Sequence, residues 1–195
     1  MRSMPDPQAT RSPSPLRLPG EGRARRWLWA ALAMIALLAA LASGARVLFS
    51  PSPAPDVRLT TTDGGTVSLA DWRGEVVLVE FWATTCAICV AEMPAIDSLH
   101  RDLRGRGLRV VAVAMSYDRP DHVLAYARRV APSFTIAIDP DGDAQAALGP
   151  VTGTPTRLLV DRDGRIVARL IGRADIARLR ELIEQALNRP AQLAG

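Results

Sequence analysis

The residues best suited to chemistry in this sequence are its only two cysteines, Cys86 and Cys89, which stand three positions apart. They follow the apolar run 76–82, which predicts a buried strand, and they precede apolar residues at helical spacing. The free N–H groups and the dipole of a helix N-terminus favour a thiolate, so we expect Cys86 to be the exposed, acidic nucleophile. Cys89 lies one turn later, close enough to form a disulfide and to resolve a mixed disulfide. The spacing therefore predicts thiol–disulfide exchange.

A cysteine pair can also belong to a zinc site, an inert structural disulfide or a Cu(I) site. Zinc needs further ligands, but no second cysteine pair exists, and His100 and His122 lack ligand spacing relative to the first. Two thiolates suit Cu(I), although no Met or His cluster accompanies them. A structural disulfide and a Cu(I)-binding metallochaperone therefore remain alternatives.

The aspartates at positions 139, 141 and 143 resemble the start of a calcium-binding loop. Such a loop beginning at Asp139 needs glycine at position 144 and glutamate at position 150, where this chain has Ala144 and Pro150. We interpret the segment as a turn and a helix cap, and we expect no metal site.

Apolar periodicity predicts strands alternating with helices after residue 56. The expected strands are 57–61, 66–69, 76–82, 108–115, 134–138, 157–161 and 165–171, and the expected helices are 89–103, 120–130, 142–148 and 176–187. The last two strands form a hairpin around Asp163-Gly164. This order predicts an α/β fold with a mixed central sheet flanked by helices.

Glu80 stands within the apolar run that precedes the cysteines. A buried carboxylate is unfavourable unless it is paired or neutral, so the position indicates a special environment. The alternative is a glutamate near the strand end whose side chain reaches solvent.

Three further motifs surround the cysteine pair. Phe81-Trp82-Ala83-Thr84 precedes it, Glu92-Met93-Pro94 follows it, and Gly153-Thr154-Pro155-Thr156 stands before a later strand. With these motifs the chain resembles the TlpA/ResA type of bacterial membrane-anchored thiol–disulfide oxidoreductases, which have the thioredoxin fold. The resemblance covers about residues 55–190, including the inserted strand–helix segment near 119–149. It implies a reaction without a cofactor.

The resemblance also implies roles for single residues. Glu80 lies where thioredoxin has its buried acid, so it should have a raised pKa and accept the proton of Cys89. Glu92 matches an acidic residue found after the cysteine motif, although an acid that favours the dipole in the first helical turn is an equal alternative. Thr154-Pro155 matches a cis-proline that faces the cysteines and leaves a backbone edge for substrate, with an ordinary trans-proline as the alternative. Trp82 is expected in the core and in the active-site wall.

Two residues depart from the family pattern. Thr85 stands where tryptophan is usual, and Ile88 stands where proline is frequent. Residues between the cysteines tune the reduction potential, so the potential of this protein does not follow from its relatives. We expect Thr85, Ala87 and Ile88, together with Trp82 and Thr154, to contact the substrate.

The basic character of the chain lies in its N-terminal part. The net charge is +4, and residues 1–50 contain seven Arg and two acidic residues. Residues 51–195 contain 17 Arg and 18 acidic residues, a net charge of −1. This distribution gives no support to nucleic-acid binding.

The N-terminal part predicts membrane insertion. Residues 1–26 form a disordered Arg/Pro-rich tail, residues 27–49 a transmembrane anchor, and residues 50–56 a Pro-rich linker. The alternative to an anchor is a signal peptide cleaved after Ala40-Leu41-Ala42. Arg residues before the span predict a cytoplasmic N-terminus and an external domain over residues 57–190, with a tail at 191–195.

These features predict a monomeric, single-pass protein of the inner membrane whose catalytic domain lies in the periplasm, or a periplasmic protein after signal cleavage. The resemblance suggests that it reduces cysteine pairs in protein substrates, such as apocytochrome c or copper-site assembly proteins. It also suggests reduction by a membrane thiol transporter of the DsbD or CcdA kind. A disulfide oxidase or isomerase remains the alternative activity.

Overall fold

A computed structural model describes residues 27, 29, 32–35 and 52–191 of the chain. Its central strand is β4 (Val76–Trp82), in which all seven residues are buried, as the run that is apolar except for Glu80 predicts. β4 pairs in parallel with β5 (Leu108–Ala114) and antiparallel with β7 (Thr156–Val160). The sheet is therefore mixed, as expected.

Eight strands form this sheet in the described part of the chain, in the order β1-β8-β7-β4-β5-β6-β2-β3. The remaining strands are β1 (Ser52–Pro53), β2 (Arg58–Thr61), β3 (Thr66–Ser68), β6 (Thr135–Ile138) and β8 (Arg165–Ile171). The helices are α2 (Ala87–Leu103), α3 (Pro120–Val130), α4 (Asp143–Ala147) and α5 (Ile176–Leu187), with short 3₁₀ helices at Leu69–Trp72 and Arg104–Arg106.

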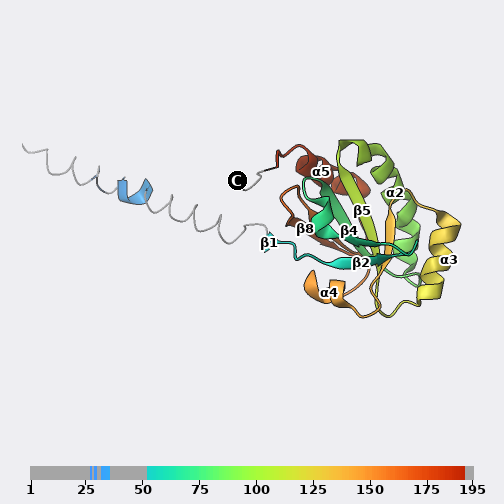
Figure 1. The fold of residues 1–195 in the computed structure, drawn as a ribbon. Coiled ribbons are helices and arrows are strands. Elements are labelled where there is room, and N and C mark those ends of the chain that lie inside the picture. The colour runs from blue at the N-terminus through green and yellow to red at the C-terminus, as the bar shows by residue number, and fades with distance from the viewer. Residues whose placement is uncertain (1–26, 28, 30–31, 36–51, 192–195) are drawn as a thin grey trace, which may run out of the picture. The chain divides into compact units, whose positions relative to one another are not determined.

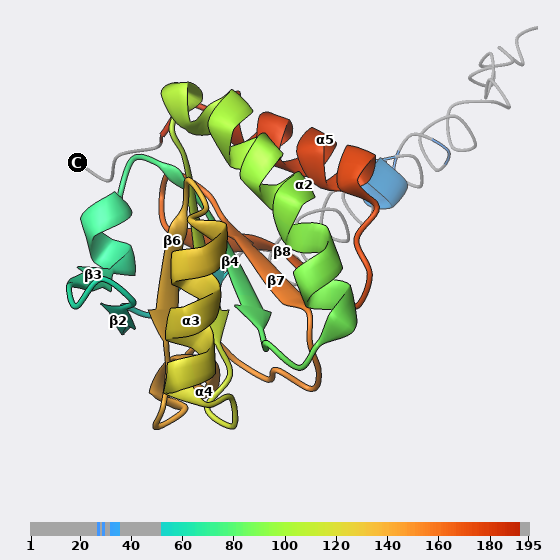
Figure 2. The ribbon, with the colours of Figure 1, turned by 90° about the vertical axis from the view of Figure 1, so that its right-hand side faces the viewer.

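Alternate residues of β4 face two separate apolar clusters. Leu78 and Trp82 pack in the cluster that includes residues of α2, α3 and α5. Val79 and Phe81 pack in the cluster on the other face, with residues of β2 and α4. Figure 2 views the sheet from the side of α2 and α3. Side chains along a strand point alternately to the two faces of the sheet. The Glu80 side chain therefore lies on the same face as Leu78 and Trp82, which is the face that α2 covers.

The predicted strands and helices over residues 57–190 are confirmed, and their ends differ from the expected ones by at most two residues. The strand expected to reach Leu69 ends at Ser68, because the Ser68 side chain caps the following 3₁₀ helix together with Asp71. The Pro-rich linker also contributes to the sheet, since Ser52–Pro53 pairs with β8 and Ala54 is buried. Proline is tolerated there because β1 is an edge strand (Figure 1).

The predicted tail at 1–26, the cleavage site at 40–42 and most of the predicted span 27–49 lie outside the described residues. Among the residues that are described, none belongs to a helix with the length and apolar character needed to cross a membrane.

Candidate active site

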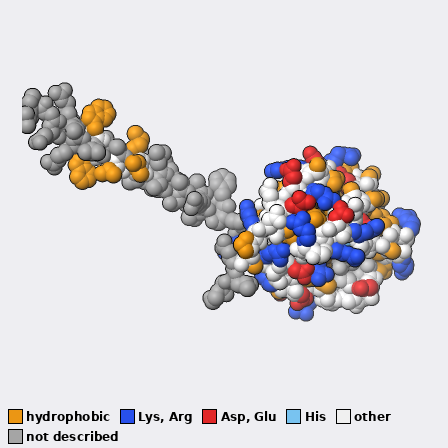
Figure 3. All heavy atoms as spheres, turned by 90° about the horizontal axis from the view of Figure 1, so that it is seen from above, with side chains coloured by type: hydrophobic (Ala, Val, Ile, Leu, Met, Phe, Trp, Pro, Cys, Tyr) orange, Lys and Arg blue, Asp and Glu red, His pale blue; other side chains and the backbone are white. Residues whose placement is uncertain are grey.

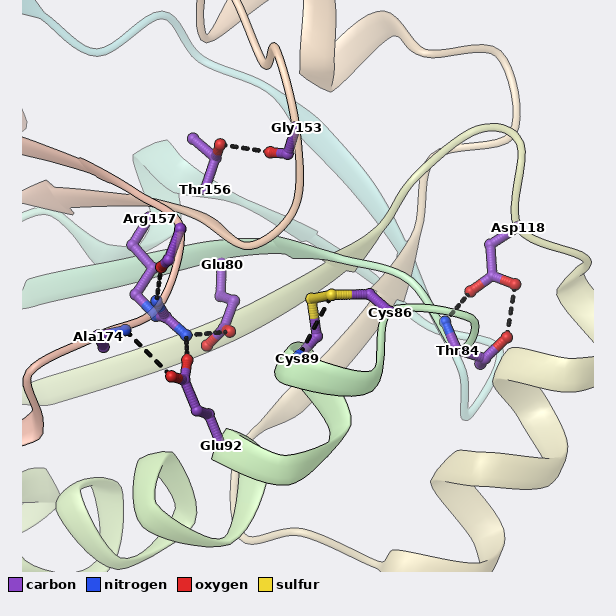
Figure 4. The surroundings of a disulfide bond; sticks show 11 residues. Glu80, Thr84, Cys86, Cys89, Glu92, Asp118, Gly153, Thr156, Arg157 and Ala174 are labelled. Carbon is purple, nitrogen blue, oxygen red and sulfur yellow. Dashed lines mark hydrogen bonds and ion pairs between the residues drawn. A yellow bond between two sulfur atoms is a disulfide. The ribbon is translucent and has the colours of Figure 1, made fainter.

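The two cysteines form a disulfide at the start of α2 (Figure 4). Cys86 is the N-cap residue of this helix, and its Sγ accepts a hydrogen bond from the Cys89 backbone N–H at 3.2 Å. Cys86 is partly exposed, whereas Cys89 is fully buried. An incoming sulfur can therefore reach only Cys86, which agrees with its predicted role as the nucleophile.

The turn that leads into Cys86 is held by Asp118, which follows β5. The Asp118 carboxylate accepts hydrogen bonds from the Thr84 backbone N–H at 2.5 Å and from the Thr84 hydroxyl at 2.7 Å. The Cys86 N–H also bonds to the Ala83 carbonyl at 3.0 Å. These bonds fix the backbone immediately before the disulfide and leave Thr85 exposed.

Behind the disulfide, Arg157 binds two buried carboxylates. Its Nη2 lies 2.8 Å from Glu80 Oε1 and 2.6 Å from Glu92 Oε2. The side chains of Glu80 and Arg157 have no exposed surface, and that of Glu92 is 8% exposed. Glu80 and Arg157 are cross-strand partners in β4 and β7, while Glu92 comes from α2. We call these three residues the Arg157 cluster.

The cluster also anchors the segment between β8 and α5. Arg157 Nη1 donates to the Gly172 carbonyl at 3.2 Å, and the Ala174 N–H donates to Glu92 Oε1 at 3.0 Å. Glu92 lies in the second turn of α2, so the alternative of an acid in the first turn is wrong. Its contacts are with the guanidinium and the Ala174 backbone.

Glu80 is the member of the cluster that can exchange a proton. Burial raises its pKa to about 7, and the negative charge of Glu92 adds to this effect, while the charge of Arg157 and its hydrogen bond oppose it. Glu80 Oε2 is buried without a hydrogen-bond partner. Figure 4 shows Glu80 between Arg157 and the disulfide. The predicted burial and raised pKa are confirmed, and the alternative of a solvent-exposed glutamate is wrong.

The Thr154–Pro155 peptide bond is cis, as predicted. Because Thr156 pairs with Phe81, Pro155 lies beside the end of β4 that leads to Cys86. The Thr156 hydroxyl donates to the Gly153 carbonyl at 2.6 Å and closes the turn. Within the described residues, no hydrogen bond involves the Thr154 backbone. This backbone is therefore available to pair with an extended chain.

The other predicted substrate contacts differ in exposure. Thr85 and Ala87 are exposed and Ile88 is partly exposed, so all three can touch a bound chain. Trp82 has no exposed surface, so the predicted place in the core is confirmed, and its contact with substrate stays a prediction. Its ring packs against Tyr126 of α3, with centroids 4.8 Å apart.

Sequence reasoning did not identify Arg157 and Asp118. A signal for Arg157 was present, because it is a basic residue directly before an apolar run in an expected strand, much as Glu80 stands within one. Asp118 follows a buried strand at the edge where Cys86 also lies. Polar residues at that edge of a sheet are natural candidates for support of a site.

The predicted role of Asp139 as a helix cap is confirmed. Its carboxylate accepts hydrogen bonds from the Ala144 and Gln145 backbone N–H groups, at 3.1 and 3.0 Å. Within the described ranges, the His, Cys, Asp and Glu side chains form no group of three that could hold a metal ion.

The chain matches the Redoxin family over residues 50–183. Thiol-disulfide oxidoreductase ResA of Geobacillus kaustophilus is 33% identical over 138 residues, which cover 68% of this chain and 77% of that protein. ResA of Bacillus thuringiensis subsp. konkukian is 29% identical over 133 residues, 68% of this chain and 75% of that protein.

Solved structures show the same fold. A thiol:disulfide interchange protein of the thioredoxin family from Chlorobium tepidum has a TM-score of 0.64 and 25% identity, covering 71% of this chain and 97% of the other. The thioredoxin domain of a thiol-disulfide oxidoreductase from Bacteroides vulgatus has a TM-score of 0.62 and 27% identity, with the same coverage. The disulfide at the start of α2 fits the thiol–disulfide oxidoreductase activity for which these relatives are named. This chain therefore belongs to the Redoxin family, as a thioredoxin-like thiol–disulfide oxidoreductase of the TlpA/ResA type.

Proposed function

We propose that the protein reduces disulfides in exported proteins, with Cys86 as the nucleophile and Cys89 as the resolving thiol. The observation that carries this proposal is the unequal exposure of the two sulfurs, because only Cys86 is accessible to a substrate. Its place at the N-terminus of α2 favours the thiolate that must attack.

The reaction consists of two exchanges. The Cys86 thiolate attacks one sulfur of the substrate disulfide, forms a mixed disulfide and displaces the other substrate sulfur as a thiolate. The Cys89 thiolate then attacks Cys86 Sγ, forms the Cys86–Cys89 disulfide and displaces the second substrate sulfur. Two electrons pass from the protein to the substrate, and the protons lost by the protein thiols balance those gained by the substrate thiolates.

Glu80 accepts the proton of Cys89 in the second exchange. Its pKa of about 7 suits proton transfer near neutral pH, and its Oε2 has no other hydrogen-bond partner. Arg157 positions the other oxygen, and Glu92 shares the charge of the guanidinium. Glu92 acts through Arg157 and is therefore a positioning residue.

The surroundings of Cys86 favour a reductant. A strong oxidant needs a strongly stabilised thiolate in its reduced form. Here Cys86 Sγ accepts one backbone N–H, and Ala87 and Ile88 bring neither a charge nor a side-chain donor. The buried Arg157 is already bound by two carboxylates. Beyond the helix N-terminus, the surroundings therefore add little to stabilise a Cys86 thiolate, which supports a low reduction potential.

We further propose that residues 27–49 anchor the protein in the inner membrane, with the catalytic domain in the periplasm. Three arginines just before an uncharged run support this orientation. The resemblance to TlpA/ResA-type proteins supports apocytochrome c or copper-site assembly proteins as substrates. It also supports a DsbD- or CcdA-like thiol transporter as the electron donor.

The reduction potential tests the direction of the reaction. Equilibration of the full chain with thiol redox buffers should give a value near the roughly −270 mV of thioredoxin, whereas a value near about −120 mV would identify an oxidase. Cys86→Ser should abolish the reduction of insulin disulfides, and retained activity would refute the mechanism. Anaerobic titration that revealed a tight Cu(I) site would support the metallochaperone instead.

A further inference from the structure

A surface pocket of about 370 Å³ adjoins the exposed side of the active-site turn. It is lined by Thr84, Thr85, Val90, His122, Ala125, Tyr126 and Arg129. We propose that this pocket binds an acidic side chain of the substrate polypeptide, close in sequence to the cysteine that Cys86 attacks. This inference rests on the proposed reaction at Cys86 and adds a substrate preference to it.

One face of α3 builds most of the pocket. His122, Ala125, Tyr126 and Arg129 follow the spacing i, i+3, i+4 and i+7, which places them in one stripe along the helix. The opposite wall consists of Thr84 and Thr85 before Cys86, with Val90 one turn into α2. The pocket therefore begins at the residue that precedes the nucleophile.

The polar groups of the pocket suit a carboxylate. The Arg129 guanidinium lies 5.6 Å from the centroid of the Tyr126 ring, which holds it against the pocket wall. Arg129 makes no ion pair with another described residue, and the Thr85 hydroxyl has no hydrogen-bond partner among them. Guanidinium and hydroxyl donors bind carboxylates through charge-assisted hydrogen bonds.

Among the described residues, no acidic side chain lines the pocket beside Arg129, and Asp118 and Asp121 have other partners. Both Asp118 oxygens accept hydrogen bonds from Thr84, and Asp121 pairs with Arg119 at 2.9 Å. Arg128, which is next in the chain, is exposed and adds positive charge without lining the pocket. The described lining of the pocket thus carries the charge of Arg129 and no carboxylate, which favours Glu or Asp over Lys or Gln.

Peptide probes can test this preference in the full chain carrying Cys89→Ser, purified with detergent. Each probe is an alanine–glycine peptide with a central cysteine activated as a neutral 2-pyridyl disulfide. Four positions are varied, namely the two residues before the cysteine and the two after it. In each probe, one of these four positions carries Glu, Gln or Lys. Cys86 attacks the peptide sulfur, a Cys86–peptide disulfide forms, and pyridine-2-thione leaves. Its absorbance gives the second-order rate constant.

We expect Glu to react about fivefold faster than Gln at one or more positions, as for a partly exposed ion pair, and Lys to react more slowly than Gln. Arg129→Gln should bring the Glu/Gln ratio close to one, whereas the matched control Arg128→Gln should keep it. A ratio near one in the starting protein at all four positions would overturn the proposal. Equal effects of both Arg variants would also overturn it, because they would show only a general attraction.

The mixed disulfide forms whether the natural reaction reduces or oxidises substrates. Absence of the Glu preference therefore counts against the pocket alone. A strongly oxidising potential, in contrast, counts against the proposed reductant function alone.

Discussion

Glu80 combines two properties that conflict in most proteins, namely complete burial and an ionisable group in the middle of a sheet. Arg157 offsets part of the desolvation, but one carboxylate oxygen stays unpaired. Such an arrangement is unfavourable for stability and useful for proton transfer. The residue therefore links the stability of the fold to the pH at which the enzyme works.

The pH dependence of stability gives a test of this link. The pKa of Glu80 is raised from 4.5 to about 7, so the folded state binds more protons than the unfolded state between these values. The stabilisation that protonation of Glu80 gives to the folded state is fully present below the unfolded pKa of 4.5. It is lost as the pH rises through about 7. The full shift in the pKa of Glu80 corresponds to a change in the free energy of unfolding on the order of 3 kcal/mol.

Glu80→Gln removes this titration. Its free energy of unfolding should therefore fall less than that of the starting protein between about pH 5 and about pH 8. Urea denaturation of both oxidised proteins measures the difference, and Glu181→Gln, in an exposed ion pair, serves as the control. Parallel pH profiles for Glu80→Gln and the starting protein would contradict the assignment.

Arg157→Met should strongly destabilise the protein, because it leaves Glu80 and Glu92 buried without their common cation. The expected loss is about 3–5 kcal/mol in the free energy of unfolding. Arg178→Met, at an exposed pair on α5, should change stability by less than about 1 kcal/mol. Denaturant titration of both variants measures the loss in the free energy of unfolding. Similar small losses in both would show that the Arg157 cluster contributes no more to stability than an exposed ion pair.

At the scale of elements, the active site depends on the connection between β4 and α2. Asp118 reaches across from the segment after β5 and satisfies both Thr84 donors, so two neighbouring parallel strands fix one turn. The cysteine pair then begins a helix whose first turn packs on the sheet. The position of Cys86 is thus determined by strand ends rather than by the cysteine motif itself.

Asp118→Ala should loosen this turn. It leaves the Thr84 N–H and hydroxyl without partners, with an expected loss of about 1–3 kcal/mol and faster amide exchange at Thr84. Asp121→Ala, which removes an exposed ion pair on the same side, is the matched control and should have little effect. Unchanged exchange at Thr84 in Asp118→Ala would show that the turn is held by other contacts.

Much of the element order followed from the sequence, because apolar periodicity reports burial directly. The 3₁₀ helix after Ser68 was not predicted, because its start depends on a capping interaction. β1 was not predicted either, because it forms only by pairing with residues more than a hundred positions away. Glu80 was recognised from its apolar neighbours. Its partner Arg157 was missed, because the register of β4 against β7 is a tertiary property.

At the scale of the whole molecule, charge is divided between a basic N-terminal part and a nearly neutral remainder. Figure 3 shows basic and acidic side chains mixed over one face of the folded part. Selectivity for substrates must then come from local features such as the pocket beside Cys86.

The proposed location and direction together predict the state of the protein in cells. Acid quenching followed by alkylation of free thiols should find Cys86 and Cys89 mainly reduced. Removal of the DsbD- or CcdA-like transporter should convert them to the disulfide, while removal of an unrelated membrane protein should not. A pair that stays oxidised in cells with the transporter would contradict the proposed reductant.

The capping hydrogen bond at the start of α2 couples the redox state to one amide proton. In the oxidised protein, the Cys89 N–H donates to a neutral disulfide sulfur. After reduction, the same acceptor becomes an anion above the thiol pKa of Cys86, and a charge-assisted bond is stronger. The nuclear magnetic resonance signal of the Cys89 amide should therefore move downfield as Cys86 ionises. Its titration would report the nucleophile's pKa without a chemical probe.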